Sequence, residues 1–208
     1  LQLDTFNDQW AFVAVAMVDT KNLRPKGFPR FMGNDFILTG FRIFVRYINN
    51  AGKSLRGLYI LKSETNKKKM SFFGNIFTHY NYTTTDIKLL KENGKITVSS
   101  LKSALHIEVI TNQVEVNLPE GSPFKDWKEA RRFAGPLPFT FTYNKKTKEV
   151  LIIEGVRKNW DPVPAEVTKN YVGFINQHKW NEIILANAFI IENIPYYWKK
   201  GKIEIWKR

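Results

Sequence analysis

The sequence predicts a mostly β fold in which two short helices flank an antiparallel sheet system. Most of the 208-residue chain consists of short apolar or alternating runs that end at turn residues, which is the pattern of strands. Aromatic residues make up 14% of the chain and are spread along it, and flat rings pack well on pleated surfaces. We therefore expect one domain over residues 1–208, with a sheet system curved or closed enough to surround a cavity.

The first half of the chain predicts a buried strand followed by a hairpin. Trp10–Asp19 is apolar on both faces and is expected to be a fully buried strand. Phe36–Ile48 and Leu55–Ser63 are expected to pair across the turn Asn49–Gly52.

A second hairpin is expected around Asn93-Gly94, because Asn-Gly between two strand-like runs is the strongest short hairpin signal. The flanking strands would be His79–Leu90 and Lys95–Leu101. Further strands are expected at Ala104–Asn117, Pro138–Tyr143, Glu149–Arg157 and within the tail from Ile183 to Trp206.

Two segments carry helical patterns. Glu64–Phe73 predicts a short helix with Ser63 as its N-cap. Ser122–Phe133 predicts a second helix, in which Ser122 caps, Pro123 occupies the first helical position and the following Gly135-Pro136 ends the helix.

The composition narrows the possible chemistry and partners. The absence of cysteine excludes disulfides, thiolate metal sites and a cysteine nucleophile. The longest apolar run, Trp10–Val18, is too short to cross a bilayer, so we expect no membrane partner and a cytoplasmic location. The net charge of +13 admits an acidic partner, yet the lysines are scattered through turns and no nucleic-acid-binding motif is present. Nucleic acid is therefore an unlikely partner. Because the sequence begins at Leu1 rather than at methionine, we expect that further residues precede it.

The segment Gly74–Tyr82 concentrates groups suited to a binding site. It places one histidine, two tyrosines and two asparagines within nine residues, at what looks like the entry to a strand. Polar and aromatic side chains in such an arrangement are able to line a pocket.

Seven segments stand in order as Leu23–Pro29, Leu55–Leu61, Ser63–Thr65, Gly74–Tyr82, Ser122–Phe124, Glu129–Phe139 and Trp160–Pro162. Together they resemble an uncharacterised bacterial protein family whose fold is similar to that of acetoacetate decarboxylase. The resemblance implies a mostly antiparallel β barrel or cone with a central cavity and a few flanking helices.

The resemblance also implies a departure from decarboxylase chemistry. Phe77–Tyr80 looks like the segment that supplies the Schiff-base lysine, and the two lysine positions hold His79 and Tyr80. Imidazole and phenol do not form the imine that this chemistry needs. Lys62 and Lys88 lie nearby in sequence, but solvated lysines at strand ends are the better interpretation of both.

The candidate site residues follow from these observations. His79 and Tyr80 are the candidate catalytic groups, since histidine titrates near neutral pH and a phenol donates a proton. Candidate ligand-binding residues are Arg42, Arg56, Tyr82 and Trp160. Arginine binds carboxylates through two parallel hydrogen bonds. Arg46 is a weaker candidate for such a contact than Arg42, and His106 and His178 are too isolated in sequence to suggest a metal site. We expect no metal and no cofactor.

Three hypotheses of function remain open at this stage. The preferred one is a protein that binds a small organic acid or keto compound in a central β-barrel cavity without a Schiff-base lysine. The second is an acid–base enzyme acting on such a compound through His79 and Tyr80. The third is a basic interaction module. The sequence leaves the ligand and the oligomeric state undefined.

Overall fold

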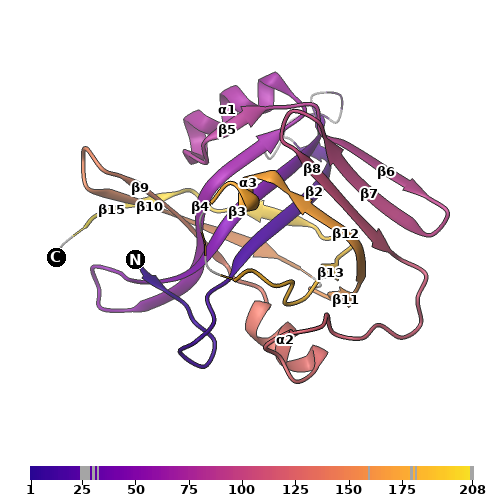
Figure 1. Ribbon diagram of the computed structural model, residues 1–208. Helices are drawn as coiled ribbons and strands as arrows, with labels where there is room; N and C mark the ends of the chain where they lie inside the picture. The colour runs from indigo at the N-terminus through magenta and orange to yellow at the C-terminus, as the bar shows by residue number, and fades with distance from the viewer. Residues whose placement is uncertain are drawn as a thin grey trace.

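The computed structural model describes residues 1–23, 29, 31, 33–158, 160–178, 180 and 182–206 (Figure 1). Within these residues the chain forms three β-sheets, of nine, four and two strands, together with three helices. The predicted mostly β class is therefore confirmed. Residues 24–28, which belong to the family-like segment Leu23–Pro29, lie outside the described residues.

The largest sheet is built around one long hairpin and is mixed rather than purely antiparallel. Its nine strands are β1 (Gln2–Leu3), β2 (Val13–Leu23), β3 (Asn34–Ile48), β4 (Ser54–Thr65), β5 (Tyr82–Thr84), β9 (Phe139–Asn144), β10 (Glu149–Arg157), β14 (Tyr196–Trp198) and β15 (Lys202–Ile205). The central order is β1-β3-β4-β9-β10-β14, and β2, β5 and β15 pair with β3, β4 and β10. The two pairings β4–β5 and β4–β9 are parallel.

The expected closed barrel is not formed by the strand pairing of the described residues. One edge of the sheet is made by β1 and β2, and the other by β14 and β15, and no ladder joins the two edges. Both edges consist of strands that cover only part of their neighbour: β1 pairs with Val45 and Arg46, and β14 pairs with residues 155–157. The sheet is therefore open.

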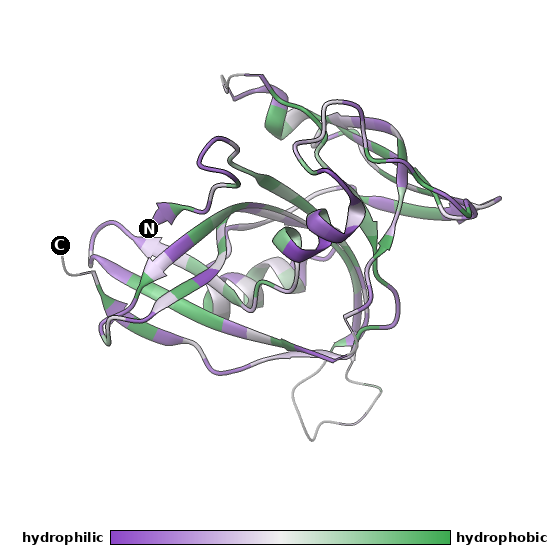
Figure 2. Cartoon of the chain, turned by 90° about the horizontal axis from the view of Figure 1, so that it is seen from below, coloured by the Kyte–Doolittle hydropathy of each residue, from purple (hydrophilic) through white to green (hydrophobic). Residues whose placement is uncertain are grey.

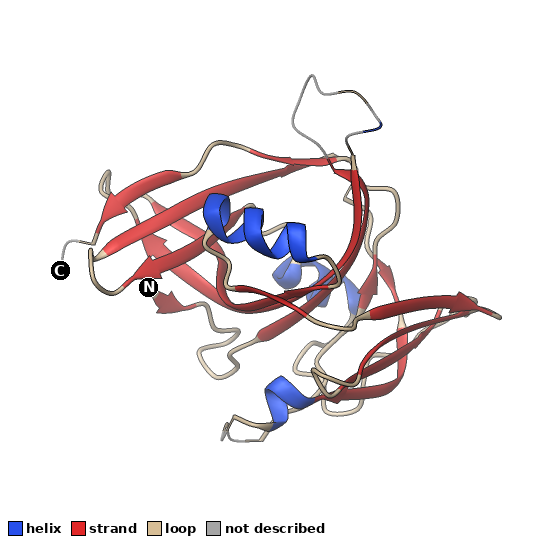
Figure 3. Cartoon of the chain, turned by 90° about the horizontal axis from the view of Figure 1, so that it is seen from above, coloured by secondary structure: helices blue, strands red, loops and turns tan. Residues whose placement is uncertain are grey.

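The second sheet has the order β12-β8-β7-β6 and consists of β6 (Lys88–Glu92), β7 (Lys95–Ser100), β8 (Leu105–Ile110) and β12 (Glu166–Val172). Its β6–β7 hairpin projects away from the larger sheet (Figure 3). Leu105, Ile107 and Val109 of β8 are buried and alternate with half-buried residues, as expected for a strand with one core face. Hydrophobic and hydrophilic residues also alternate along strands elsewhere in the chain (Figure 2). The third sheet pairs β11 (Val163–Pro164) with β13 (Phe189–Ile190).

The three helices are α1 (Lys68–Thr78), α2 (Trp127–Ala134) and α3 (Gly173–Asn176). The prediction of a helix over Glu64–Phe73 was wrong in its start, because β4 continues to Thr65 and pairs there with both β3 and β5. Ser63 is therefore a strand residue, and Lys67 precedes α1 without a side-chain cap.

The second predicted helix was also placed too early. Asp126 is the N-cap of α2, and its Oδ1 accepts a hydrogen bond from the amide of Glu129 at 2.7 Å. An aspartate followed three residues later by a glutamate is a stronger start signal than Ser122. The oxygen of Ser122 instead joins two loops, since its hydroxyl donates to the carbonyl of Ala186 at 2.7 Å. No helical pattern predicted the short α3.

Both predicted hairpins are confirmed, whereas two strand predictions need correction. Ile48 pairs with Ser54, and Glu92 pairs with Lys95 across Asn93-Gly94, whose φ angles are both positive. The strand predicted over Trp10–Asp19 begins only at Val13, and most of its residues are half-buried because it is an outer strand beside β3.

The strand predicted over His79–Leu90 is divided into β5 and β6. His79 and Asn81 have left-handed φ angles of 54° and 53°, which end α1 and prevent a regular strand from starting at His79. The strand predicted over Ala104–Asn117 is shorter than expected, because β8 ends at Ile110.

Four groups of buried side chains form the core, and one of them joins two sheets. Phe41 of the largest sheet packs with Val98, Leu105 and Ile107 of the second sheet. Phe174 of α3 lies against Phe41, with a ring-centroid distance of 4.5 Å. The second sheet is thus held to the first by an apolar interface rather than by strand pairing.

Candidate functional site

Strand β3 carries two arginines on one face, separated by a phenylalanine. Arg42, Phe44 and Arg46 are two residues apart and therefore point to the same side of the sheet. Phe44 is buried with Leu58 and Leu137 between the two arginines. Each arginine belongs to a separate polar group, and the two groups differ in how their charge is neutralised.

The first group, called here the tyrosine–arginine cluster, consists of Arg42, Arg157, Tyr80, Tyr82 and Tyr196. Arg42 comes from β3, Arg157 ends β10 and Tyr196 begins β14. Tyr82 begins β5, and Tyr80 lies two residues before it. The charge of Arg42 acts on Arg157, and both arginines interact electrostatically with Tyr80 and Tyr196. Five polar side chains from four strand regions are therefore brought together.

The two arginines of this cluster have no carboxylate partner among the described residues. Arg42 is half-buried, forms no ion pair or hydrogen bond with any described residue, and has an Nε that is sealed from solvent without an acceptor. Among the described residues, Arg157 donates only to the carbonyl of Leu137, at 3.3 Å. Burial lowers the pKa of both guanidinium groups, and for Arg157 the charge of Arg42 lowers it further. Both remain charged at neutral pH, since arginine starts from a very high pKa.

Tyr80 and Tyr82 of the cluster are held as neutral hydroxyl groups. Burial raises the pKa of Tyr80 and of Tyr82 above the usual value, against the opposing effect of Arg42. The hydroxyl of Tyr80 hydrogen-bonds Thr140, and that of Tyr196 lies 3.2 Å from the hydroxyl of Thr20. The cluster thus presents cationic and neutral polar groups and contains no acidic side chain.

Trp160 extends the cluster on the side of Arg157. The guanidinium carbon of Arg157 lies 5.6 Å from the centroid of a Trp160 ring. The indole Nε1 of Trp160 is sealed from solvent and has no acceptor among the described residues. A second unsatisfied donor therefore lies close to the arginine pair.

The segment Gly74–Tyr82 owes much of its composition to local structure. The side chain of Asn75 accepts from the amide of Tyr82 at 2.6 Å and donates to its carbonyl at 2.9 Å. Gly74 is required by close packing, because a β-carbon there would lie 2.5 Å from the ring of Tyr82. These contacts fix α1 against β5 and hold Tyr82 in place.

The predicted catalytic pair is not brought together. His79 is the αL residue that ends α1, and its side chain is exposed, whereas Tyr80 is 4% exposed and points into the core. The expectation that a strand starts at His79 fails here, because the chain turns at His79 and again at Asn81.

Arg56 belongs to the second arginine group, called here the Asp4 cluster, together with Asp4 and Arg46. The carboxylate of Asp4 is 1% exposed and accepts from Nε of Arg46 at 2.7 Å and from Nε of Arg56. The guanidinium carbon of Arg56 also lies 4.5 Å from the ring centroid of Phe133. Arg42 and Arg56, both predicted to bind a ligand, therefore lie in separate places.

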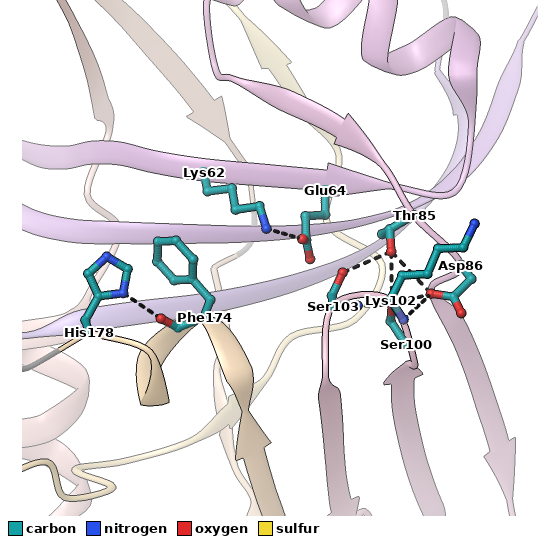
Figure 4. Close-up of polar contacts among 9 residues, drawn as sticks. All are labelled: Lys62, Glu64, Thr85, Asp86, Ser100, Lys102, Ser103, Phe174 and His178. Carbon is teal, nitrogen blue, oxygen red and sulfur yellow. Dashed lines mark hydrogen bonds and ion pairs between the residues drawn. The ribbon is translucent and has the colours of Figure 1, made fainter.

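The two lysines weighed as Schiff-base candidates have ordinary surroundings. Lys62 forms an ion pair with Glu64 (Figure 4). The Nζ–Oε1 distance of this pair is 2.6 Å, and Nζ lies 5.6 Å from the ring centroid of Phe174. Glu64 is 2% exposed and lies within β4, so the prediction that it begins a helix was wrong. Lys88 is exposed at the start of β6.

The remaining histidines do not form a metal site. His178 lies beside α3, and its Nδ1 is 2.7 Å from the carbonyl of Phe174 (Figure 4). His106 lies on β8 and has an Nε2 without a partner. Within the part of the chain that the structure describes, no group of three or more histidine or acidic residues is arranged to hold a metal ion.

Comparison with family models places the chain in a known group of sequences. A model described as an uncharacterized conserved protein matches residues 1–188, which is most of the chain. The chain belongs to the DUF2071 family. Comparison with curated proteins and with solved structures found no match. Across the described residues, no helix is long and apolar enough to cross a bilayer.

Two members of the tyrosine–arginine cluster were missed in the sequence. Arg157 closes the predicted strand Glu149–Arg157, and Tyr196 follows Pro195 in the tail, where neither position carries a motif. The one sequence signal for Arg157 was weak: it is an arginine at the end of a mainly apolar strand. Their meeting with Arg42 depends on sheet pairing between β9, β10 and β14, which joins residues far apart in sequence.

Proposed function

We propose that this protein binds a small organic acid or keto compound at the tyrosine–arginine cluster. The observation that carries the proposal is the proximity of two partly buried arginines, Arg42 and Arg157, for which the described residues offer no carboxylate. A buried charge is costly unless it is paired, and buried donors normally find acceptors. An anionic ligand would supply both the charge and the acceptors.

The residue types around the arginines fit a carboxylate or keto acid. A guanidinium group binds a carboxylate through two parallel hydrogen bonds. The neutral hydroxyl groups of Tyr80 and Tyr82 can donate to a carbonyl oxygen, and the indole of Trp160 offers a further donor. In this proposal Arg42 and Arg157 bind the acid group, and the tyrosines orient the remainder of the ligand.

The likeness in fold to acetoacetate decarboxylase forms part of the proposal and rests on the seven sequence segments. Open, mixed β-sheets replace the barrel that this likeness implied. Covalent chemistry through a lysine is not proposed, because His79 and Tyr80 occupy the corresponding positions and Lys62 is paired with Glu64.

The two alternatives receive less support. An acid–base enzyme using His79 and Tyr80 would need both side chains at one substrate, and the exposed position of His79 does not favour this. A basic interaction module would rest on the net charge of +13 alone, which is also what a solvated lysine-rich surface gives. A cytoplasmic location stays a prediction.

A calorimetric screen tests the proposal. The parent chain is titrated with acetate, succinate, pyruvate and acetoacetate, followed by the variants Arg42→Met, Arg157→Met and Tyr80→Phe. We expect at least one acid to bind the parent and to bind both arginine variants about tenfold or more weakly, since a charge-assisted hydrogen bond contributes about 1.5–3 kcal/mol.

The matched control is Lys145→Met, which removes an exposed cation in the β9–β10 turn, outside the cluster. This variant should bind the acid as the parent does. The proposal fails if no acid binds the parent, or if Arg42→Met and Arg157→Met retain the affinity of the parent.

A further inference from the structure

A solvent-open groove lies between the Asp4 cluster and α2. Its volume is about 540 Å³, and five basic side chains line it: Arg46, Arg56, Lys125, Lys128 and Arg132. The rings of Phe6 and Phe133 form its apolar wall, with centroids 5.3 Å apart. Cations from β3, β4 and the region of α2 therefore surround one apolar surface.

Three of the five cations have no ion-pair partner among the residues that the structure describes. These are Lys125, Lys128 and Arg132, all of which are exposed. The groove also contains two acidic side chains, but both are engaged at the start of α2. Asp126 accepts from the amide of Glu129 at 2.7 Å, and Glu129 accepts from the amide of Lys125 at 2.9 Å.

The other two cations are held in fixed positions. Asp4 accepts from Nε of both Arg46 and Arg56, which leaves the outer amino groups of each guanidinium for other acceptors. Arg56 is further ordered by its contact with the Phe133 ring at 4.5 Å. Its Nη2 is sealed from solvent and has no partner among the described residues.

We propose that this groove binds a phosphate-bearing small molecule that also carries a flat apolar group. Phosphate offers several acceptor oxygens to cations arriving from different elements, and arginine forks match its geometry. The flat group would pack against Phe6 and Phe133, which a bare ion would leave uncovered. Phe44, Leu58 and Leu137 lie between this groove and Arg42, so the inference does not depend on the proposed acid site.

Isothermal titration with phenyl phosphate and with inorganic phosphate tests the inference. The parent chain is compared with the double variant Lys128→Gln/Arg132→Gln, whose exposed positions should leave folding intact. We expect phenyl phosphate to bind the parent more tightly than inorganic phosphate does. We expect the double variant to bind phenyl phosphate about tenfold more weakly, from two interactions of about 0.7 kcal/mol each.

Two controls separate this groove from other sites. Lys145→Gln removes one exposed charge in the β9–β10 turn, and Arg42→Met alters the acid site; both should bind phenyl phosphate like the parent. Unchanged affinity in the double variant, or no binding of phenyl phosphate at millimolar concentration, would overturn the inference. Equal affinity for phenyl phosphate and inorganic phosphate would refute the role of the phenylalanine wall.

Discussion

The Asp4 cluster and the tyrosine–arginine cluster differ in how the charge of two neighbouring arginines is neutralised. Each places two arginines beside apolar side chains on one face of β3 and its neighbours. In the first, the buried carboxylate of Asp4 accepts from both guanidinium groups. In the second, tyrosine hydroxyl groups surround the arginines and no described carboxylate reaches them.

This difference suggests different roles for the two arginine pairs. Asp4 ties the N-terminal segment to β3 and β4, so its cluster contributes to the stability of the fold. The charge on Arg42 and Arg157 opposes folding, because it is moved out of water without compensation. A cost of this kind is common where a site must receive a ligand.

Asp4→Asn should cause the largest change in stability among the variants of the two clusters. The change keeps the shape of the side chain but leaves Arg46 and Arg56 without an opposite charge. We expect the free energy of unfolding to fall by about 2 kcal/mol, which is below the usual range for a buried pair because both arginines are partly exposed. Urea denaturation of the parent and the variant measures this difference.

The matched control for this prediction is Asp8→Asn. Asp8 is exposed in the nearby turn and has a φ of 56°, a conformation that asparagine also adopts readily. The control should unfold within about 0.5 kcal/mol of the parent. Equal losses of unfolding free energy in Asp4→Asn and Asp8→Asn would show that the ion pairs of Asp4 do not stabilise the fold.

Replacing one arginine in each cluster by methionine should change stability in opposite directions. Arg56→Met leaves the buried Asp4 with a single partner and should lower the free energy of unfolding by about 1 kcal/mol. Arg42→Met removes a charge that lacks a partner and should raise it by about 1 kcal/mol. Thermal or urea unfolding in the absence of added acids provides the measurement, and a loss of stability in Arg42→Met would contradict the comparison.

The sequence predicted the framework of the fold better than the geometry of the site. The long hairpin from Asn34 to Thr65 was readable because apolar periodicity and turn residues are local signals. The parallel pairing of β4 with β5 and β9 was not, since no local pattern states which distant strands meet. Whether the sheet closes into a barrel depends on the same pairings between distant strands, so the sequence did not predict that it is open.

The same distinction applies to the site residues. Arg42, Tyr80 and Tyr82 were predicted and do meet in the tyrosine–arginine cluster. Arg56 was predicted for the same site, but Asp4, more than fifty residues earlier in the chain, draws it into another cluster. His79 was singled out for its chemistry, whereas its backbone conformation at the end of α1 places the side chain in solvent.

Gly40→Ala should displace the side chain of Arg42 without removing its charge. A β-carbon at position 40 would lie 3.0 Å from Nε and 3.1 Å from Nη2 of Arg42, so the flexible guanidinium must move. We expect stability to change by no more than about 0.5 kcal/mol, because alanine also lowers the entropy of the unfolded chain. Acid binding should weaken, as titration calorimetry would show.

Gly155→Ala is the matched control for this substitution. A β-carbon there would lie 3.8 Å from Nη2 of Arg157, which is an ordinary contact that requires no movement. Acid binding should therefore be retained in Gly155→Ala. Similar losses in both variants would point to a general effect of the added methyl group on the sheets.

The pH dependence of acid binding should be the smallest effect and separates a binding site from an acid–base enzyme. Burial raises the pKa of Tyr80 and Tyr82, and Arg42 and Arg157 keep their charge, so these four groups do not change protonation between about pH 6 and pH 9. Affinity for the acid should stay constant over that range. The tyrosines contribute stability that is complete below the ordinary tyrosine pKa, about 10, and that is lost as the pH rises through their raised values. A change in affinity or turnover near pH 6.5 that disappears in His79→Ala would instead assign a role to the exposed histidine and favour acid–base chemistry.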